Sequence, residues 1–200
     1  MTVHPEARIH PQADVEEGAE VGPGTRIWHL VHVRSGARVG AECIIGRGVY
    51  IDQGAIIGNR VKIQNYVSVY KGVTLEDGVF VGPHAVFTNE RRPRSVTPEM
   101  RLKGADDWEL TSTLVRQGAA IGANAVIVCG VTVGRWAMVG AGSVVVRDVP
   151  NHGLVVGNPA RLIGYVCRCG ARLTPREDAP DGVMVCATCG RTVNVNADEG

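Results

Sequence analysis

The chain of 200 residues has few aromatic residues, almost no net charge and no long apolar run. Aromatic residues make up 4% of the sequence, and the formal net charge is +1 at pH 7. A conventional two-layer core usually contains more Leu and Phe than this sequence has. A chain this close to neutrality also has no broad electrostatic field that attracts nucleic acid or an anionic membrane. No stretch reaches the roughly 18 apolar residues of a membrane-spanning helix. We therefore expect neither nucleic acid nor a membrane as a partner.

The N-terminal residues, Met1 to Arg8, lack a basic segment followed by an apolar run. The sequence therefore predicts no signal peptide and a cytoplasmic location. Cys43 and Cys129 are isolated, whereas the other four cysteines lie in the last 34 residues. Without a secretion signal, such paired cysteines indicate a metal site before they indicate disulfides.

What the sequence does have is a period of six residues, the kind of repeat to look for first. Neither the helical period of about 3.6 nor strand alternation of about two produces it, whereas a short strand followed by a tight corner does. Three such hexads close one triangular coil, and coils stack at the strand spacing of about 4.8 Å, because a single coil cannot bury its own interior. The sequence therefore predicts an all-β parallel β-helix. The apolar positions at steps of six are Val3, Ile9, Val15, Val21, Ile27, Val33, Val39, Ile45, Ile51, Ile57, Ile63, Val69, Leu75, Val81 and Phe87.

The period fails after Phe87 and resumes at Val115. The charged segment between them, residues 88–114, contains Pro93 and Pro98, which predicts five coils, a projecting loop and two more coils, about seven in all. A long loop in so regular a scaffold is usually functional, and the alternative is a tolerated surface insertion. The pattern dissolves from Asn151 onward. We place a domain boundary near residue 165, with the β-helix in residues 1–165 and a small tail in residues 166–200.

Short motifs over roughly residues 20–165 resemble the hexapeptide-repeat acyltransferases, and among them the nucleotide-sugar 3-N-acetyltransferases. The most specific motif is Phe87-Thr88-Asn89, followed by the loop and by Leu114-Val115-Arg116. By this signature the chain resembles enzymes that acetylate UDP-2-acetamido-3-amino-2,3-dideoxy-glucuronic acid. The resemblance implies a left-handed coil, a homotrimer, acetyl-CoA as co-substrate and a UDP- or dTDP-linked amino sugar of surface-polysaccharide (lipopolysaccharide) biosynthesis as acceptor. Further motifs of the family are Ile27-Trp28-His29, Gln64-Asn65, Phe80-Val81-Gly82-Pro83, Ile121-Gly122-Ala123-Asn124 and Asn158-Pro159-Ala160-Arg161.

Residues 18 apart should stack on one face, so Ala123 lies under Ala141, and a further step of 18 reaches Pro159. The last two coils then carry a strip without large side chains along which a pantetheine arm can lie, as in the family. Arg161 suits a CoA phosphate, because its fork geometry favours phosphate oxygens. The alternative is that Gly and Ala only serve the turns. The candidate acetyl-CoA residues are Ala123, Ala141, Gly142, Pro159 and Arg161.

We expect the sugar one face over from this strip, near the corner where the loop departs. Outward polar groups on a rigid scaffold are suited to positioning a substrate. Arg94, in the loop, is a candidate for the nucleotide phosphates or a sugar carboxylate. The other candidate sugar-binding residues are Arg47, Gln64, Asn65, Tyr66 and Lys71.

The chemical step is attack of an amine on a thioester, which needs an uncharged amine and a proton acceptor. His84 is the candidate base, since an imidazole titrates at about 6.5. His84 as a substrate contact remains an alternative, and the resemblance implies that the departing CoA thiolate can take the proton instead. Asn89 is expected to anchor the sugar. His84 and Asn89 are thus the candidate catalytic residues.

The tail carries two short cysteine pairs, Cys167 with Cys169 and Cys186 with Cys189, and Gly follows each pair. This pattern predicts a zinc ribbon, although the first pair has one intervening residue instead of the usual two. Four thiolates leave no open coordination position, which favours a structural Zn²⁺. Free or redox-active thiols are the alternative.

Of three alternative functions, one fits the sequence and two disagree with it. An acetyltransferase for serine or a simple sugar is the nearest of them. A γ-type carbonic anhydrase needs three histidines about one coil apart, whereas His29, His32 and His84 span three coils. A scaffold that only oligomerises would not need the bare strip or the Asn158-Pro159-Ala160-Arg161 ending.

Overall fold

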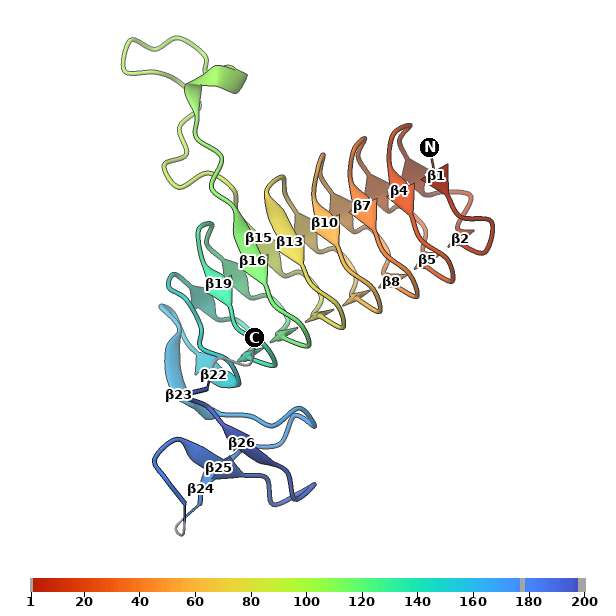
Figure 1. Cartoon of the computed structure of the whole chain (residues 1–200). Helices are drawn as coiled ribbons and strands as arrows, with labels where there is room; N and C mark the ends of the chain where they lie inside the picture. The colour runs from red at the N-terminus through yellow and green to blue at the C-terminus, as the bar shows by residue number, and fades with distance from the viewer. Residues whose placement is uncertain (1, 177–178, 198–200) are drawn as a thin grey trace.

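The computed structural model describes residues 2–176 and 179–197. It confirms the predicted all-β parallel solenoid, in which three sheets of very short strands form the sides of a prism (Figure 1). The first sheet contains β1 (Thr2–Val3), β4 (Glu20–Val21), β7 (Arg38–Val39), β10 (Ile56–Ile57), β13 (Val73–Leu75), β16 (Thr113–Val115) and β19 (Thr132–Val133). The second contains β2 (Arg8–Ile9), β5 (Arg26–Ile27), β8 (Ile44–Ile45), β11 (Lys62–Ile63), β14 (Phe80–Val81), β17 (Ala120–Ile121), β20 (Met138–Val139), β22 (Gly153–Val156) and β23 (Arg161–Tyr165). The third contains β3 (Asp14–Val15), β6 (His32–Val33), β9 (Tyr50–Ile51), β12 (Ser68–Val69), β15 (Val86–Phe87), β18 (Val126–Ile127) and β21 (Val144–Val145).

The hexad explains the two-residue strands of these sheets. In them the first residue faces outward and the second faces the core, as Lys62 and Ile63 do in β11. Strands one coil apart pair in parallel register, so Ile63 lies between Ile45 and Val81 in a buried column. Each such Ile or Val contributes about 1.5–3 kcal/mol on burial. Among the described residues of the prism, the inward residues of the first coil are partly exposed, whereas those of the following coils are buried.

The corners between strands form three edges along the prism, which we number by the sheets they join. Edge I joins the first and second sheets, and its corners include residues 40–43, 58–61 and 76–79. Edge II joins the second and third sheets through residues 46–49, 64–67, 82–85, 122–125 and 140–143. Edge III joins the third sheet to the first through residues 52–55, 70–72 and 128–131, and the loop departs from this edge.

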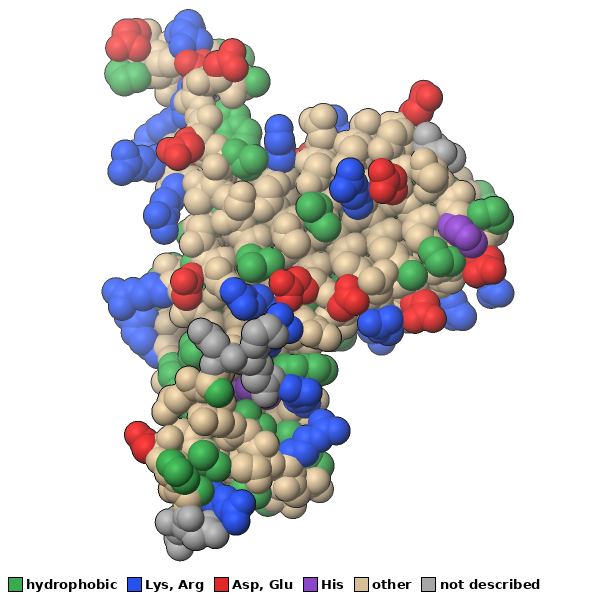
Figure 2. Space-filling view, viewed as in Figure 1, with side chains coloured by type: hydrophobic (Ala, Val, Ile, Leu, Met, Phe, Trp, Pro, Cys, Tyr) green, Lys and Arg blue, Asp and Glu red, His purple; other side chains and the backbone are tan. Residues whose placement is uncertain are grey.

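The loop stands clear of the prism, with charged side chains gathered on it (Figures 1 and 2). It spans residues 88–112, so the predicted bound of 114 was wrong, because Thr113 and Leu114 already pair with Val73 and Thr74. Two antiparallel bridges and the short 3-10 helix η1 (Ala105–Asp107) give it local order. Ion pairs of Arg101 with Asp107, at 2.6 Å, and of Lys103 with Glu90, at 3.0 Å, brace it further.

The last coil departs from the regular step. Val139 pairs with Val155, sixteen residues on, and not with residue 157. The shortening occurs at edge III, where the corner from Val145 to Val149 is two residues shorter than the one beneath it, from Ile127 to Val133. The strands β22 and β23 then form an antiparallel hairpin. The prediction that Pro159 stacks on Ala141 was therefore wrong: Pro159 lies in the hairpin turn.

A small antiparallel sheet follows the hairpin, made of β24 (Thr174–Pro175), β25 (Val183–Val185) and β26 (Thr192–Asn194). It has its own buried cluster of Cys167, Leu173, Cys186 and Val193. Within the described residues, no helix is long and apolar enough to cross a membrane.

Candidate functional site

Edge II carries the candidate base and the candidate acetyl-CoA strip in one line. Backbone amides of successive coils donate to the coil before them, from His84 to Asn65 at 3.0 Å, from Asn124 to Pro83 at 2.9 Å and from Gly142 to Ala123 at 2.8 Å. The expectation that His84 and its neighbours lie one face over from the strip was therefore wrong. The corner residues that follow one another along this edge are Gly48, Tyr66, His84, Asn124 and Gly142.

The strip at the end of edge II is bare for two reasons. A Cβ on Gly142 would meet no atom within 4 Å, so the edge is open there, and its φ of +69° is one that glycine adopts without strain. A Cβ on Gly122 would instead collide with the backbone of Ala141, so adjacent coils approach closely only because Gly122 has no side chain. The exposed corner of Ala141 and Gly142 can therefore accept a thin ligand against its backbone.

The preceding corners of edge II carry rings instead. The rings of Tyr66 and His84 stack with centroids 5.3 Å apart and an interplanar angle of 20°. The Arg47 guanidinium carbon lies 5.7 Å from the centroid of the Tyr66 ring. These three predicted site residues thus form one contiguous group.

Gln64 and Asn65 lie beside this group, in a shallow groove that Trp28 and Arg47 also line. The Asn65 Oδ1 accepts a hydrogen bond from the backbone nitrogen of Arg47 at 2.9 Å. Asn59 and Asp77 clamp the corners of edge I in the same way. One polar atom of Asn65 is therefore committed to holding the corner, which the sequence did not reveal.

Lys71, Asn89 and Arg94 belong to edge III and its loop, and within one chain they are not on the edge that carries His84. The backbone nitrogen of Lys71 donates to Asp52 Oδ2 at 3.2 Å, and the carbonyl oxygen of Asn89 accepts from Thr111 at 3.1 Å. The exposed Arg94 guanidinium donates to the carbonyl oxygen of Pro93 at 2.9 Å.

A polar network along the third sheet and edge III was missed by the sequence analysis. Glu16 Oε1 lies 2.8 Å from both His32 Nε2 and Arg34 Nε, and Arg34 reaches the Tyr50 hydroxyl at 3.3 Å. The Tyr50 hydroxyl donates in turn to Asp52 Oδ1 at 3.0 Å. The pKa of Glu16 is lowered, chiefly by the hydrogen bond from the backbone of Ser35 and then by that from His32. The signal was available, because Glu16, Arg34 and Asp52 follow one another at the 18-residue step of the coil.

The hairpin turn that contains Pro159 and Arg161 is fastened to the end of edge II. The Gly157 amide donates to Ser143 Oγ at 3.1 Å, and the Ala160 amide donates to the carbonyl oxygen of Val144 at 2.8 Å. The exposed Arg161 guanidinium donates to the carbonyl oxygen of Ala160 at 3.1 Å. The structure thus places this turn against the bare strip, by a route other than the predicted stacking.

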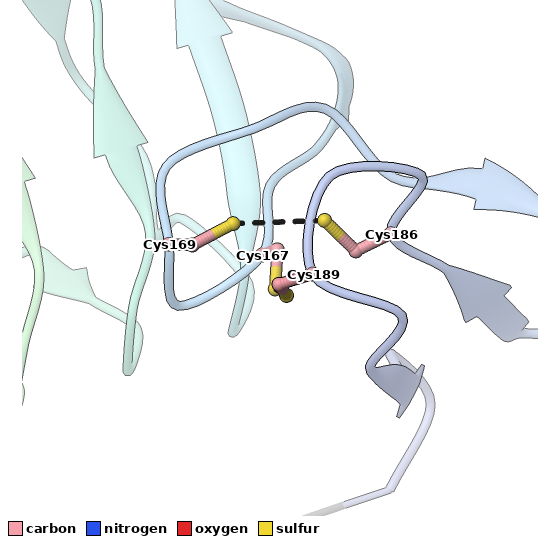
Figure 3. Close-up of side chains that lie close together, drawn as sticks. All are labelled: Cys167, Cys169, Cys186 and Cys189. Carbon is pink, nitrogen blue, oxygen red and sulfur yellow. Dashed lines mark hydrogen bonds between the residues drawn. The ribbon is translucent and has the colours of Figure 1, made fainter.

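The four cysteines of the tail point toward one another from two turns (Figure 3). Their sulfur atoms all lie within 4.8 Å of one another, with 3.5 Å between Cys167 and Cys189 and 3.6 Å between Cys169 and Cys186. Four thiolates at about 2.3 Å from a tetrahedral Zn²⁺ have sulfurs about 3.8 Å apart, so this donor set fits the ion. Hydrogen bonding, first from the backbone of Cys189, lowers the pKa of Cys186 to about 6, although burial opposes it. No other group of three or more metal-binding side chains is found among the described residues.

Two family models match the repeats. The bacterial transferase hexapeptide family (six repeats) matches residues 18–53 and 54–89, and the hexapeptide repeat of succinyl-transferase matches residues 36–71 and 117–147. Together the models match more than half of the chain. With the stacked hexads and the bare strip, this defines the class of protein: the chain belongs to the hexapeptide-repeat acyltransferases.

Curated relatives refine the comparison. The chain is 61% identical over 61 residues to the dTDP-3-amino-3,6-dideoxy-alpha-D-galactopyranose 3-N-acetyltransferase of Aneurinibacillus thermoaerophilus, which covers 30% of this chain and 32% of that protein. It is 37% identical over 108 residues to the serine acetyltransferase of Escherichia coli K12, covering 52% of this chain and 38% of that protein. The chain thus matches about a third of the length of these relatives.

Two solved structures share the fold. A hexapeptide-repeat acetyltransferase of Vibrio cholerae in complex with acetyl-CoA has a TM-score of 0.54 and 28% identity, covering 65% of this chain and 70% of that one. A variant of an N-acyltransferase from Bacillus cereus, in complex with dTDP and coenzyme A, has a TM-score of 0.56 and 15% identity, covering 84% and 85% of the two chains. The second likeness supports the fold alone.

Proposed function

We propose that the chain transfers the acetyl group of acetyl-CoA to the 3-amino group of a nucleotide-linked amino sugar. One observation carries the proposal. Along edge II, the corners that contain His84, Asn124 and Gly142 lie in successive coils, so a candidate base lies next to the first corner of the bare strip. A pantetheine arm lying on Ala123, Ala141 and Gly142 brings its thioester toward His84. The acetyl-CoA in the Vibrio cholerae structure supports this co-substrate.

The reaction then needs few groups from the protein. The amine nitrogen attacks the thioester carbonyl carbon, a C–N bond forms, and the C–S bond breaks. The His84 imidazole accepts the proton that the amine loses and returns it to the departing CoA thiolate, so the products are the N-acetyl sugar and free CoA. Pro159 and Arg161 border the strip at its end, where Arg161 binds a CoA phosphate.

The acceptor is bound by two groups of residues in this proposal. Arg47, Gln64 and Asn65 bind it beside His84, while Lys71, Asn89 and Arg94 approach from edge III. Because these groups lie on different edges of one chain, we infer a homotrimer of left-handed prisms, in which edge III and the loop of one subunit face edge II of the next. The substrate of the Aneurinibacillus relative favours a dTDP-linked 6-deoxy sugar over a UDP-linked uronic acid. We infer that this reaction is a cytoplasmic step of surface-polysaccharide synthesis.

We also propose that Cys167, Cys169, Cys186 and Cys189 bind one structural Zn²⁺. The observation behind this is the compact sulfur cluster, whose spacing fits tetrahedral thiolate coordination. When bound, the ion ties the two turns of the tail together and contributes directly to its folding.

A single assay tests the enzymatic proposal. Purified protein is incubated with acetyl-CoA and one acceptor at a time, namely dTDP- and UDP-linked 3-amino sugars, an unlinked amino sugar and serine, and CoA release and product mass are followed. Turnover with a nucleotide-linked 3-amino sugar alone is the expected result. Turnover with serine alone would instead support the second candidate, which the identity to serine acetyltransferase favours.

The role of His84 is tested separately. The His84→Gln variant is expected to lose about 100-fold in kcat, within the usual range for a general base. Nearly full turnover by this variant would assign the proton to the CoA thiolate and would leave the transferase proposal standing.

A further inference from the structure

The Tyr66 ring is held from both neighbouring coils of edge II. A Cβ on Gly48, one coil earlier, would lie within the space of the Tyr66 ring, so the ring rests on a corner that is open only because Gly48 has no side chain. One coil later, the His84 ring stacks on Tyr66 at 5.3 Å and 20°. Both residues have φ values in the left-handed region, +58° for Tyr66 and +59° for His84, so their side chains leave equivalent corners in the same direction.

No second ring contact holds His84 among the residues that the structure describes. It is an exposed residue on a corner, and an imidazole there can rotate about its two side-chain torsions. Among the described residues, His84 has one ring contact, the stacking on Tyr66, and its side chain has no hydrogen bond or ion pair. The Arg47 guanidinium, 5.7 Å from the Tyr66 centroid, packs on the same ring and restricts it further.

We propose that Tyr66 is a positioning residue for His84. The Tyr66 ring, resting on Gly48, holds the imidazole plane of His84 so that a ring nitrogen faces the site of amine attack on the adjoining strip. The inference rests on the proposed function, and it assigns the Tyr66 ring to His84, because the ring stacks on the imidazole and its Cδ1–Cε1 side lies against Gly48. The Tyr66 hydroxyl takes no part in this role.

Two substitutions separate the ring from the hydroxyl. Tyr66→Phe keeps the stacking and should retain kcat within about twofold. Tyr66→Leu removes it and should lower kcat about threefold to tenfold with little change in KM, since an aromatic pair contributes about 0.5–1.5 kcal/mol beyond its buried area. Phe80→Leu is the matched control, because Phe80 is a similarly exposed aromatic residue, 38% against 43% for Tyr66, on a strand and outside the stack.

A spectroscopic measurement tests the stacking without activity. In protein labelled with 13C at histidine Cε1, the signal missing from His84→Gln identifies His84. Its proton should be shifted by the Tyr66 ring current in the wild type and in Tyr66→Phe, and should move to the position of an exposed imidazole in Tyr66→Leu. An unchanged His84 signal in Tyr66→Leu would overturn the proposal.

A double mutant distinguishes the two levels of inference. If Tyr66 acts through His84, Tyr66→Leu has no further effect on kcat in the His84→Gln background. A full additional loss in that background would contradict positioning and would return Tyr66 to direct substrate binding. A His84→Gln variant with wild-type kcat would contradict the base role of His84, and with it the functional consequence of the stack, while the NMR result would still report on the stack itself.

Discussion

The backbone nitrogen of Asn124 donates a hydrogen bond to the carbonyl oxygen of Pro83 at 2.9 Å, although the whole projecting loop lies between them in sequence. The corner of His84 and the first corner of the bare strip therefore lie next to each other on one edge, in successive coils. The loop leaves and returns on a different edge, so it interrupts the chain without interrupting edge II. This adjacency places a titratable imidazole next to a surface suited to a thioester.

Filling the bare strip should block acetyl-CoA. Gly142→Leu puts a side chain where the thioester arm is proposed to lie, and acetyl-CoA affinity measured by calorimetry should fall at least tenfold. Gly54→Leu is a matched control, because Gly54 has a φ of +70° against +69° for Gly142 and also has no atom within 4 Å of an added Cβ. Both variants carry a similar backbone strain of about 1–2 kcal/mol. Equal loss of affinity in the two would show that the strip is not the acetyl-CoA site.

Removing the exposed Arg94 guanidinium should weaken acceptor binding. We expect Arg94→Ala to raise KM for the nucleotide sugar by about tenfold, the effect of losing one charge-assisted hydrogen bond, with KM for acetyl-CoA unchanged. Arg60→Ala is the control, since Arg60 is an exposed arginine of edge I that pairs with Asp77 at 3.2 Å. Steady-state kinetics with each substrate varied in turn measures the two KM values. An unaltered KM for the acceptor in Arg94→Ala would refute the assignment of Arg94 to acceptor binding.

The metal content of the tail follows from its cysteines. Protein purified without chelator should contain about one zinc per chain by elemental analysis. Cys186→Ser should lose the zinc, because a structural site needs all four of its ligands. Cys129→Ala should keep it, since Cys129 is buried in the prism, apart from the cluster. Zinc-free wild-type protein would leave the cysteines as free thiols.

Acidification should weaken the network around Glu16. The folded-state pKa of Glu16 lies below its ordinary value of 4.5, because Ser35 and His32 hydrogen-bond to the carboxylate. Its stabilising contribution is therefore present above pH 4.5 and is lost as the pH falls through the lower, folded pKa. Between about pH 5 and pH 3, a range that brackets this protonation, the free energy of unfolding should fall less in Glu16→Gln than in the wild type. Denaturant titrations at each pH measure it. Glu17→Gln, at the exposed neighbour, should follow the wild type, and an identical pH profile for Glu16→Gln would disprove the role.

The buried His152 joins the tail to the last coil. Its Nδ1 lies 2.8 Å from the carbonyl oxygen of Val166, and its backbone nitrogen donates to the carbonyl oxygen of Arg135 at 2.8 Å. His152→Ala leaves a cavity and removes the hydrogen bond between Nδ1 and Val166. It should lower the free energy of unfolding by about 2–4 kcal/mol, which a lower Tm and faster proteolysis of the tail would show. Zinc content should be unchanged, because His152 is not in the cysteine cluster. His4→Ala, at an exposed site, is the control, and equal stability of the two variants would contradict the role.

The sequence by itself determined the prism, its seven coils and the columns of residues at the 18-residue step. The reason is that inward side chains at every sixth residue are buried only when the chain forms coils that stack on one another. The clustering of the four cysteines was also readable, because metal ligands must lie close together whatever the path of the chain between them.

Only the tertiary structure decided which edge each candidate residue occupies. Counting in steps of 18 fails wherever the chain inserts or omits residues, as it does in the loop and at the short corner from Val145 to Val149. The hydrogen bonds across those irregularities brought His84 under the bare strip and put Pro159 in a hairpin turn. The stacking of Tyr66 on His84 depended in addition on ring orientation, which neighbouring coils set and sequence spacing does not.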